Sequence, residues 1–246
     1  MGDLVFLTVA SYLTATLSGT LGLGGGSILM VLILNVMAPA QAIPFHGVVQ
    51  LVSTGSRVAL FREATAWGIV GRFALLLLPG VVLGMLLFQG MSEEAVKIAI
   101  GVFVLGALYL KHVRLFGDGD TPLAFFYPFG FLVGALSIVV GGVGVLFAPF
   151  VIRRELNKEG VVGTQSTLAA VTHLAKVAAF GVVGFHFREY LGAFALVLPA
   201  VVLGAMTGKA LLGRFDERVF RWLYQGTLVG LSLKLIVWDG LAGLLA

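Results

Sequence analysis

Two long apolar runs, each interrupted near its middle by glycines, constrain this chain most. The first covers residues 17–32 (LSGTLGLGGGSILMVL) and the second covers residues 131–147 (FLVGALSIVVGGVGVLF). Each glycine costs a helix about 1 kcal/mol relative to alanine, so consecutive glycines break the helix and expose backbone groups. Within a bilayer, exposed backbone groups are tolerated only where they are buried in protein or line a cavity. Paired breaks of this kind are typical of the binding sites of secondary transporters.

The composition is that of a membrane protein. Of 246 residues, 59% are hydrophobic and 11% are charged, with a mean hydropathy of +1.05, whereas a soluble domain carries about 25% charged residues. The net charge of +4 does not indicate nucleic-acid binding, because Lys and Arg in a membrane protein mostly record its topology. With no cysteine in the chain, disulfides and thiolate chemistry are excluded. We therefore expect an all-α polytopic membrane protein.

Eight apolar segments are expected to be helical. They are residues 4–38 (interrupted), 42–62, 66–89, 94–112, 122–152 (interrupted), 160–184, 188–212 and 217–238. At 1.5 Å per residue, each interrupted segment is roughly 50 Å long, too long for a single crossing of a bilayer core of about 30 Å. Each is therefore either a hairpin with both ends on one face or a steeply tilted broken helix.

The distribution of basic residues favours hairpins. If both interrupted segments return to the side they entered, the basic connections at 57–72, 111–114, 153–158 and 209–221 lie on one face. The opposite face keeps only Lys97, Arg188 and Lys234. The positive-inside rule prefers this arrangement, which puts both termini on the non-cytoplasmic side. Whether the hairpins are re-entrant to half depth or cross fully stays open.

The two halves of the chain resemble each other. LLLLPGVVLGMLL at 75–87 repeats as ALVLPAVVLGAMT at 195–207, and GSRVALF at 55–61 repeats as LAKVAAF at 174–180. We predict two inverted structural repeats, residues 1–116 and 122–246, joined by a short linker at 117–121. Each repeat would contain one Gly-interrupted re-entrant or broken hairpin and three transmembrane helices, a plan that recurs in transporters.

The GLGGGS turn, its weaker echo GGVG and this tandem four-segment plan resemble the TauE/SafE family of membrane sulfite exporters. The resemblance covers about residues 11–237, although the second half lacks the full glycine triplet. It implies a multi-pass carrier in the prokaryotic inner membrane that exports a small sulfur-containing anion, such as sulfite or a short organosulfonate.

Helices are expected to resume after the breaks, over 27–35 and 145–152, so that two helix N-termini would face each other and bind an anion. Arg57 and Lys176 occupy the same place in the two repeats, and no carboxylate lies mid-span to neutralise them. The candidate substrate-binding residues are Gly24, Gly25, Gly26, Ser27, Gln50, Ser53, Arg57, Gly141, Gly142, Gly144, Gln165, Thr172, His173 and Lys176. Other readings stay open: the glycines could serve only helix packing, Arg57 could reach the head groups, and the polar residues could join helices to one another.

Alternating access with the anion at the midplane, between the two breaks, is the predicted mechanism. His173 is the only mid-span group that titrates near neutrality, while His46 is expected close to a segment end. Either His173 relays a proton, or the membrane potential alone drives export, which is the interpretation that the sequence favours. An anion channel is the alternative.

An intramembrane hydrolase is disfavoured, because GxSxG and HExxH are absent. We expect no enzymatic activity, no cofactor and no metal. The expected partners are the anion and the lipid bilayer, not nucleic acid, and homo-oligomerisation stays open.

Overall fold

The computed structural model describes residues 1–21, 25–110, 120–211 and 217–245, and within these ranges it contains helices and no strand. The all-helical class is therefore confirmed for the described residues. The first half contains α1 (Gly2–Leu21), α2 (Gly25–Ile33), α3 (Pro39–Phe61), α4 (Trp67–Gln89) and α5 (Glu93–Leu110). The second half contains α6 (Phe126–Val140), α7 (Ala148–Val151), α8 (Lys158–Val182), α9 (Leu191–Leu211), α10 (Glu217–Ile236) and α11 (Ala242–Leu245).

Shorter turns connect some of these helices. The 3₁₀ turns are η1 (Leu123–Phe125), η2 (Gly144–Leu146) and η3 (Phe187–Tyr190), and residues Val237–Leu241 form a π-helical turn. These elements occupy the eight apolar segments expected from the sequence, while the division into two repeats stays a prediction.

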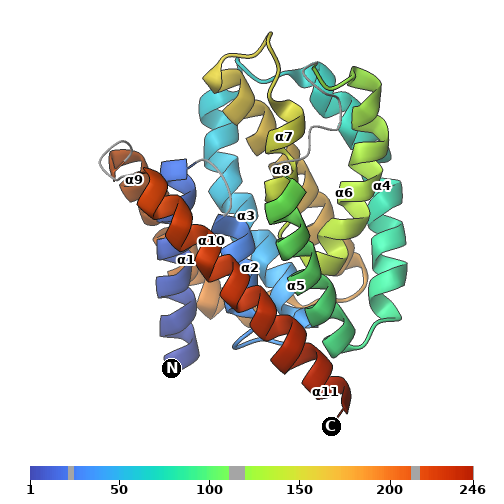
Figure 1. The fold of residues 1–246 in the computed structure, drawn as a ribbon, viewed down its shortest axis with the longest axis vertical. Helices are drawn as coiled ribbons and strands as arrows, with labels where there is room; N and C mark the ends of the chain where they lie inside the picture. The colour runs from blue at the N-terminus through green and yellow to red at the C-terminus, as the bar shows by residue number, and fades with distance from the viewer. Residues whose placement is uncertain (22–24, 111–119, 212–216, 246) are drawn as a thin grey trace.

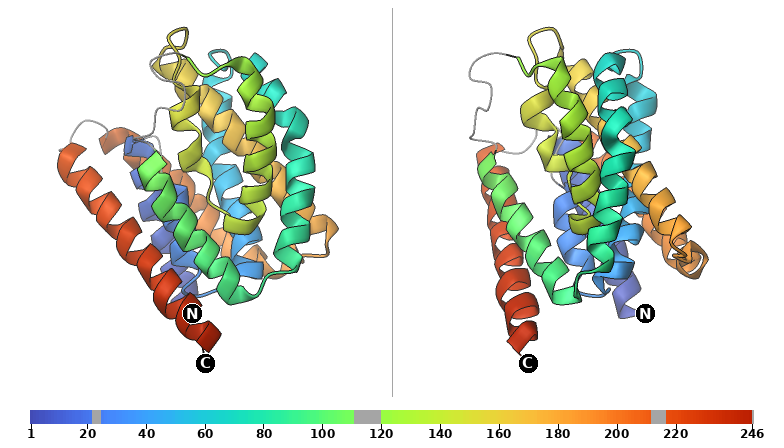
Figure 2. Two further views of the ribbon diagram at one scale, coloured as in Figure 1. Left: turned by 45° about the vertical axis from the view of Figure 1, so that its right-hand side comes forward. Right: turned by 90° about the vertical axis from the view of Figure 1, so that its right-hand side faces the viewer.

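Both interrupted segments fold back on themselves. In Figure 1, α1 rises from the end where both termini lie, and the chain returns through α2 to that same end before α3 begins. The second hairpin, α6 and α7, opens towards the opposite end of the molecule, as the two views in Figure 2 also show. The hairpins thus enter the helical bundle from opposite ends.

The returning arm of each hairpin is short. Helix α2 has nine residues and α7 has four, which at 1.5 Å per residue gives about 14 Å and about 6 Å. Neither arm is long enough to cross a bilayer core of about 30 Å as a helix.

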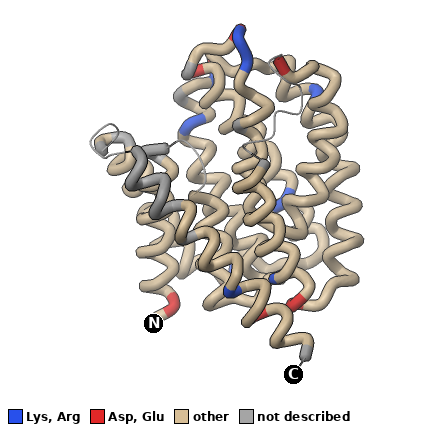
Figure 3. Tube along the Cα trace, viewed as in Figure 1, with Lys and Arg blue, Asp and Glu red and all other residues tan. Residues whose placement is uncertain are grey.

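Three helical stretches among the described residues are long and apolar enough to cross a membrane: Trp67–Gln89, Leu123–Val140 and Phe187–Gly208. On α4, the exposed side chains Leu75, Leu78, Val82 and Leu86 recur at helical spacing, as expected of a face in contact with lipid. Figure 3 shows that charged residues lie mostly towards the two ends of the molecule and are few in the middle. This distribution fits a chain that spans a bilayer.

Helices α3 and α8 are as long as these spans but more polar, and they lie against each other at the centre of the bundle. Their polar side chains are buried rather than exposed to lipid. These buried polar residues are His46, Ser53 and Thr54 on α3, and Thr164, Gln165, Ser166, Thr167, Thr172, His173 and Lys176 on α8. Buried polar side chains within a membrane-spanning bundle commonly mark a ligand or ion pathway, so the interface of α3 and α8 is the candidate region for a site.

The two halves pack against each other reciprocally. Helix α1 lies along α9, and its counterpart α6 lies along α4. A side chain at Gly84 would overlap the backbone of Ala135 on α6, and one at Gly204 would overlap the carbonyl of Tyr12 on α1. Gly84 and Gly204 are the residues that align in the sequence repeat, so aligned glycines make equivalent close helix contacts in the two halves.

Candidate binding site at the two glycine breaks

The two glycine breaks, far apart in the sequence, touch each other at the centre of the bundle. Ser27 Oγ, on the first turn of α2, donates a hydrogen bond of 3.0 Å to the carbonyl oxygen of Gly142. A Cβ atom added to Gly142 would lie 3.1 Å from Ser27 Cα, closer than ordinary van der Waals contact. The breaks therefore meet closely, and a side chain at position 142 would force them apart by a few tenths of an ångström.

The second break is a tight γ-turn centred on Gly141. The N–H of Gly142 donates to the carbonyl of Val140 over 2.7 Å, and Gly141 has φ +72° and ψ −56°. This conformation is strained for any residue with a side chain. The expected helix over 145–152 does not form as one element, because η2 and the four-residue α7 occupy that stretch. Only the first break therefore leads into a helix of more than two turns, α2.

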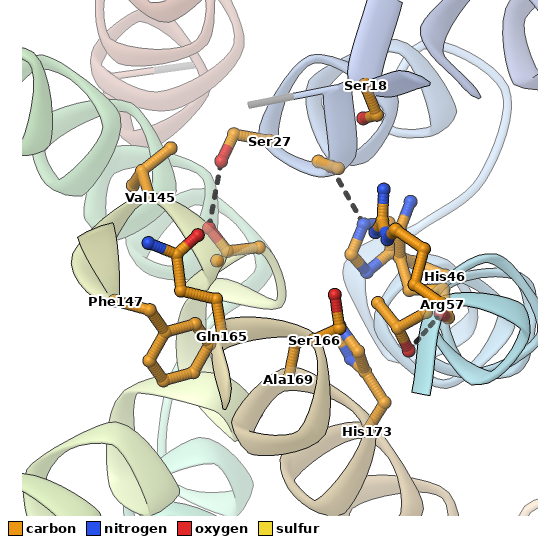
Figure 4. Close-up of a pocket in the computed structure, with 15 residues that line it drawn as sticks. Ser18, Ser27, His46, Arg57, Val145, Phe147, Gln165, Ser166, Ala169 and His173 are labelled. Carbon is orange, nitrogen blue, oxygen red and sulfur yellow. Dashed lines mark hydrogen bonds between the residues drawn. The ribbon is translucent and has the colours of Figure 1, made fainter. Parts of the chain in front are cut away.

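A cavity of about 60 Å³ lies where the breaks meet α3 and α8. Since one water needs about 10–15 Å³ of such space, the cavity holds a few waters or one small ion. Its lining residues are Ser18, Gly26, Ser27, His46, Gln50, Thr54, Arg57, Gly142, Gly144, Val145, Phe147, Gln165, Ser166, Ala169 and His173. In Figure 4, Arg57 and His46 lie on one side, Gln165 and Phe147 lie on the other, and Ser27 comes from α2.

Arg57 supplies the positive charge of the cavity. Its Nε atom is buried and has no hydrogen-bond partner among the described residues. None of the residues that line the cavity is acidic. A buried guanidinium nitrogen without a partner is costly, and an anionic ligand would compensate for it.

Two histidines lie edge to face beside Arg57. Their ring centroids are 5.8 Å apart with an interplanar angle of 75°, and both line the cavity. His46 Nε2 makes a 2.8 Å hydrogen bond with the carbonyl oxygen of Gly26. The Nδ1 atom of each ring is buried and has no partner in the described part of the chain.

Lys176 is fully buried but lies outside the cavity lining. Its Nζ donates to the carbonyl of Gly141 over 2.9 Å, so its charge stabilises the γ-turn of the second break. Its aliphatic stem crosses α3 at Gly47, where an added Cβ would lie 2.9 Å from Lys176 Cε. The structure thus places Lys176 behind the second break rather than in the cavity.

The predicted site residues divide into two groups. Those that line the cavity are Gly26, Ser27, Gln50, Arg57, Gly142, Gly144, Gln165 and His173. Those that lie outside its lining are Gly25, Ser53, Gly141, Thr172 and Lys176. Gly25 packs against Thr14 and Ser18 of α1, and Thr172 Oγ1 donates to the carbonyl of Leu168 on its own helix. Gly24 falls outside the described residues.

Seven lining residues were absent from the predicted set, and helical spacing could have found several of them. His46, Gln50 and Thr54 line the cavity at intervals of four on α3, and Gln165, Ala169 and His173 do the same on α8. The sequence repeat aligns His46 with Gln165, Gln50 with Ala169, and Thr54 with His173. The remaining lining residues, Ser18, Val145, Phe147 and Ser166, carry no comparable signal.

Comparison with known proteins agrees with this architecture. The model of the family described as "Sulfite exporter TauE/SafE" matches residues 7–235. The chain belongs to the sulfite exporter TauE/SafE family. No curated protein and no solved structure matches it. The family is one of membrane transporters, so this chain is a membrane transport protein.

Proposed function

We propose that this chain exports a small sulfur-containing anion, sulfite or a short organosulfonate, across the prokaryotic inner membrane by alternating access. The family membership supports the substrate class. The single observation that carries the position of the site is the buried, unpartnered Nε of Arg57 in a cavity with no acidic lining residue.

The anion would lie between Arg57 and the first turn of α2. The guanidinium binds oxyanions through charge-assisted hydrogen bonds. The first N–H groups of α2, beside Gly26 and Ser27, have no acceptor within the helix and carry partial positive charge. The amide of Gln165 supplies a further donor from the opposite wall. A sulfite or sulfonate group matches a cavity this small, whereas a nucleotide or a peptide is too large.

The proposed inverted repeats are supported by the reciprocal packing of α1 on α9 and of α6 on α4, and by the opposite directions of the two hairpins. Matched positions on α3 and α8 line the same cavity, so the walls come from both repeats. Rocking of one repeat against the other would then open the cavity to alternate sides. We place both termini on the non-cytoplasmic side, because the connections that carry Arg62, Arg153 and Arg154 lie at the opposite end.

The test is anion binding by the purified protein and flux in proteoliposomes, using sulfite, sulfoacetate and sulfate. Wild type is compared with Arg57→Gln and with Arg62→Gln, which changes an exposed arginine outside the cavity. Saturable flux of a sulfur anion supports the proposal if Arg57→Gln raises its half-saturating concentration and Arg62→Gln leaves it unchanged. Flux that does not saturate indicates a channel. If wild type ignores all three anions, the proposed substrate class is wrong.

A further inference from the structure

The hydrogen bond of His46 determines which of its ring nitrogens carries a proton. The Gly26 carbonyl can only accept, so His46 Nε2 must donate over the 2.8 Å that separates them. In a neutral ring, Nδ1 is then a bare acceptor. His46 is 1% exposed, it lines the cavity, and its Nδ1 has no partner among the described residues. A lone pair in a cavity that binds anions would repel the ligand.

One proton on Nδ1 removes this conflict. The ring, which lines the cavity, then donates through Nε2 to the Gly26 carbonyl and has a second N–H at Nδ1 to offer to a ligand. Without a ligand, a third positive charge would lie beside Arg57 and Lys176, which Coulomb repulsion opposes. A bound anion offsets that repulsion. We propose that His46 takes up one proton whenever the anion binds, so that the site carries anion and proton together.

This inference rests on the proposed function of the same cavity, and it reverses the interpretation that the sequence alone favoured. The proton comes from the aqueous phase and forms one N–H bond with the Nδ1 lone pair, and no other bond changes. His173, 5.8 Å away on the opposite central helix, offers a second unpartnered Nδ1. It is the group through which the proton reaches or leaves His46.

Among the described side chains around the pair, Lys176 is the other buried amine or imidazole, but its Nζ lies outside the cavity lining and donates to the Gly141 carbonyl. Arg57 and Lys176 are the charged residues beside the pair. The other titratable side chains described on α8 and on the helices packed against α3 and α8 lie near helix ends and do not line the cavity; they are Arg72, Glu93, Glu94, Lys97, Tyr109, Tyr127 and Glu159. The histidine pair is therefore the proton acceptor available at the site.

The experiment measures the Kd of sulfite and of methanesulfonate at several pH values above the ordinary histidine pKa of about 6.5. Methanesulfonate keeps a fixed charge over that range, so any proton taken up with it must bind to the protein. Uptake of one proton per anion makes the wild-type Kd rise about tenfold per pH unit. Calorimetry in two buffers of different ionisation enthalpy counts the same proton without any mutation.

His46→Gln tests the assignment, because its side-chain amide can still donate to the Gly26 carbonyl while Nδ1 is lost. We expect its Kd for methanesulfonate to be independent of pH, whereas the exposed His186→Gln should keep the wild-type slope. Should only sulfite bind, His46→Gln should lower its pH slope by one unit relative to wild type. Binding with equal slopes in wild type and His46→Gln, or without proton uptake by wild type, overturns the coupling but leaves the proposed function intact. If neither anion binds to wild type, the proposed function fails and the coupling fails with it.

Discussion

Gly141→Ala tests whether the second break is built as the structure shows, and its cost follows from two separate terms. The first is backbone strain, because Gly141 has φ +72° and an alanine held in such a region costs about 1–3 kcal/mol. The second is overpacking, because the new Cβ would lie 2.5 Å from Met30 Sδ and 3.2 Å from Met30 Cγ. Overpacking of a filled core costs about 1–3 kcal/mol. We expect a total loss of about 2–6 kcal/mol in the free energy of unfolding.

Gly184→Ala is the matched control for the first term alone. Gly184 follows the C-terminus of α8, has φ +93°, and has no atom within 4 Å of an added Cβ. For Gly184→Ala, the free energy of unfolding should therefore fall only by the strain term of about 1–3 kcal/mol. Gly144→Ala is a second control, since Gly144 has a negative-φ backbone and open space around its Cβ. Gly144→Ala should leave the free energy of unfolding nearly unchanged.

The assay is equilibrium unfolding of the purified protein in detergent, followed by tryptophan fluorescence, with all three variants measured under one condition. The decisive quantity is the difference between Gly141→Ala and Gly184→Ala, because it isolates the contact with Met30. Equal losses for these two variants would refute the packing of the second break against α2. A large loss of stability in Gly144→Ala would contradict the finding that the space around an added Cβ at Gly144 is open.

Three further predictions concern the charged and capping residues. Arg57→Gln removes a charge-assisted hydrogen bond of about 1.5–3 kcal/mol, so the Kd for the anion should rise about 10- to 150-fold in a binding titration, while Arg62→Gln should leave it unchanged. Lys176→Met leaves the Gly141 carbonyl without its donor, so stability should fall by about 1–3 kcal/mol in thermal or chemical unfolding, with a smaller change in Kd than Arg57→Gln produces. Asn157→Ala removes the side chain that caps α8 by accepting from the Gly160 N–H over 2.8 Å, which should cost about 1 kcal/mol of stability and leave anion binding unchanged.

Much of the fold follows from the sequence because the bilayer restricts it so strongly. Apolar runs of fixed length must form helices, since no other regular structure satisfies the backbone of an isolated segment in lipid. Consecutive glycines mark where those helices stop, and the first break does separate α1 from α2. Basic connections indicate which segments return to the side they entered. These signals are local, and each can be read within one window of the chain.

The geometry of the second break could not be predicted in this way. Its γ-turn depends on Gly141, and its position depends on the hydrogen bond from Ser27 to the Gly142 carbonyl, across 115 residues of sequence. Helix propensity suggests that a helix resumes after Gly144, but the folded chain forms only η2 and the four-residue α7 there. The apolar lining residues Val145 and Phe147 became part of the cavity for the same reason. No pattern within either segment records such a contact.

Arg57 and Lys176 show how aligned residues come to differ in role. Each is the cation that follows the polar stretch of its central helix, yet only Arg57 lines the cavity. The two breaks explain the difference. At the first, the Gly26 carbonyl accepts a hydrogen bond from His46. At the second, the γ-turn turns the Gly141 carbonyl into the protein, and Lys176 is used to satisfy it. The scaffold is therefore nearly symmetric, but one of its two aligned cations is committed to structure, which leaves Arg57 as the aligned cation that lines the cavity.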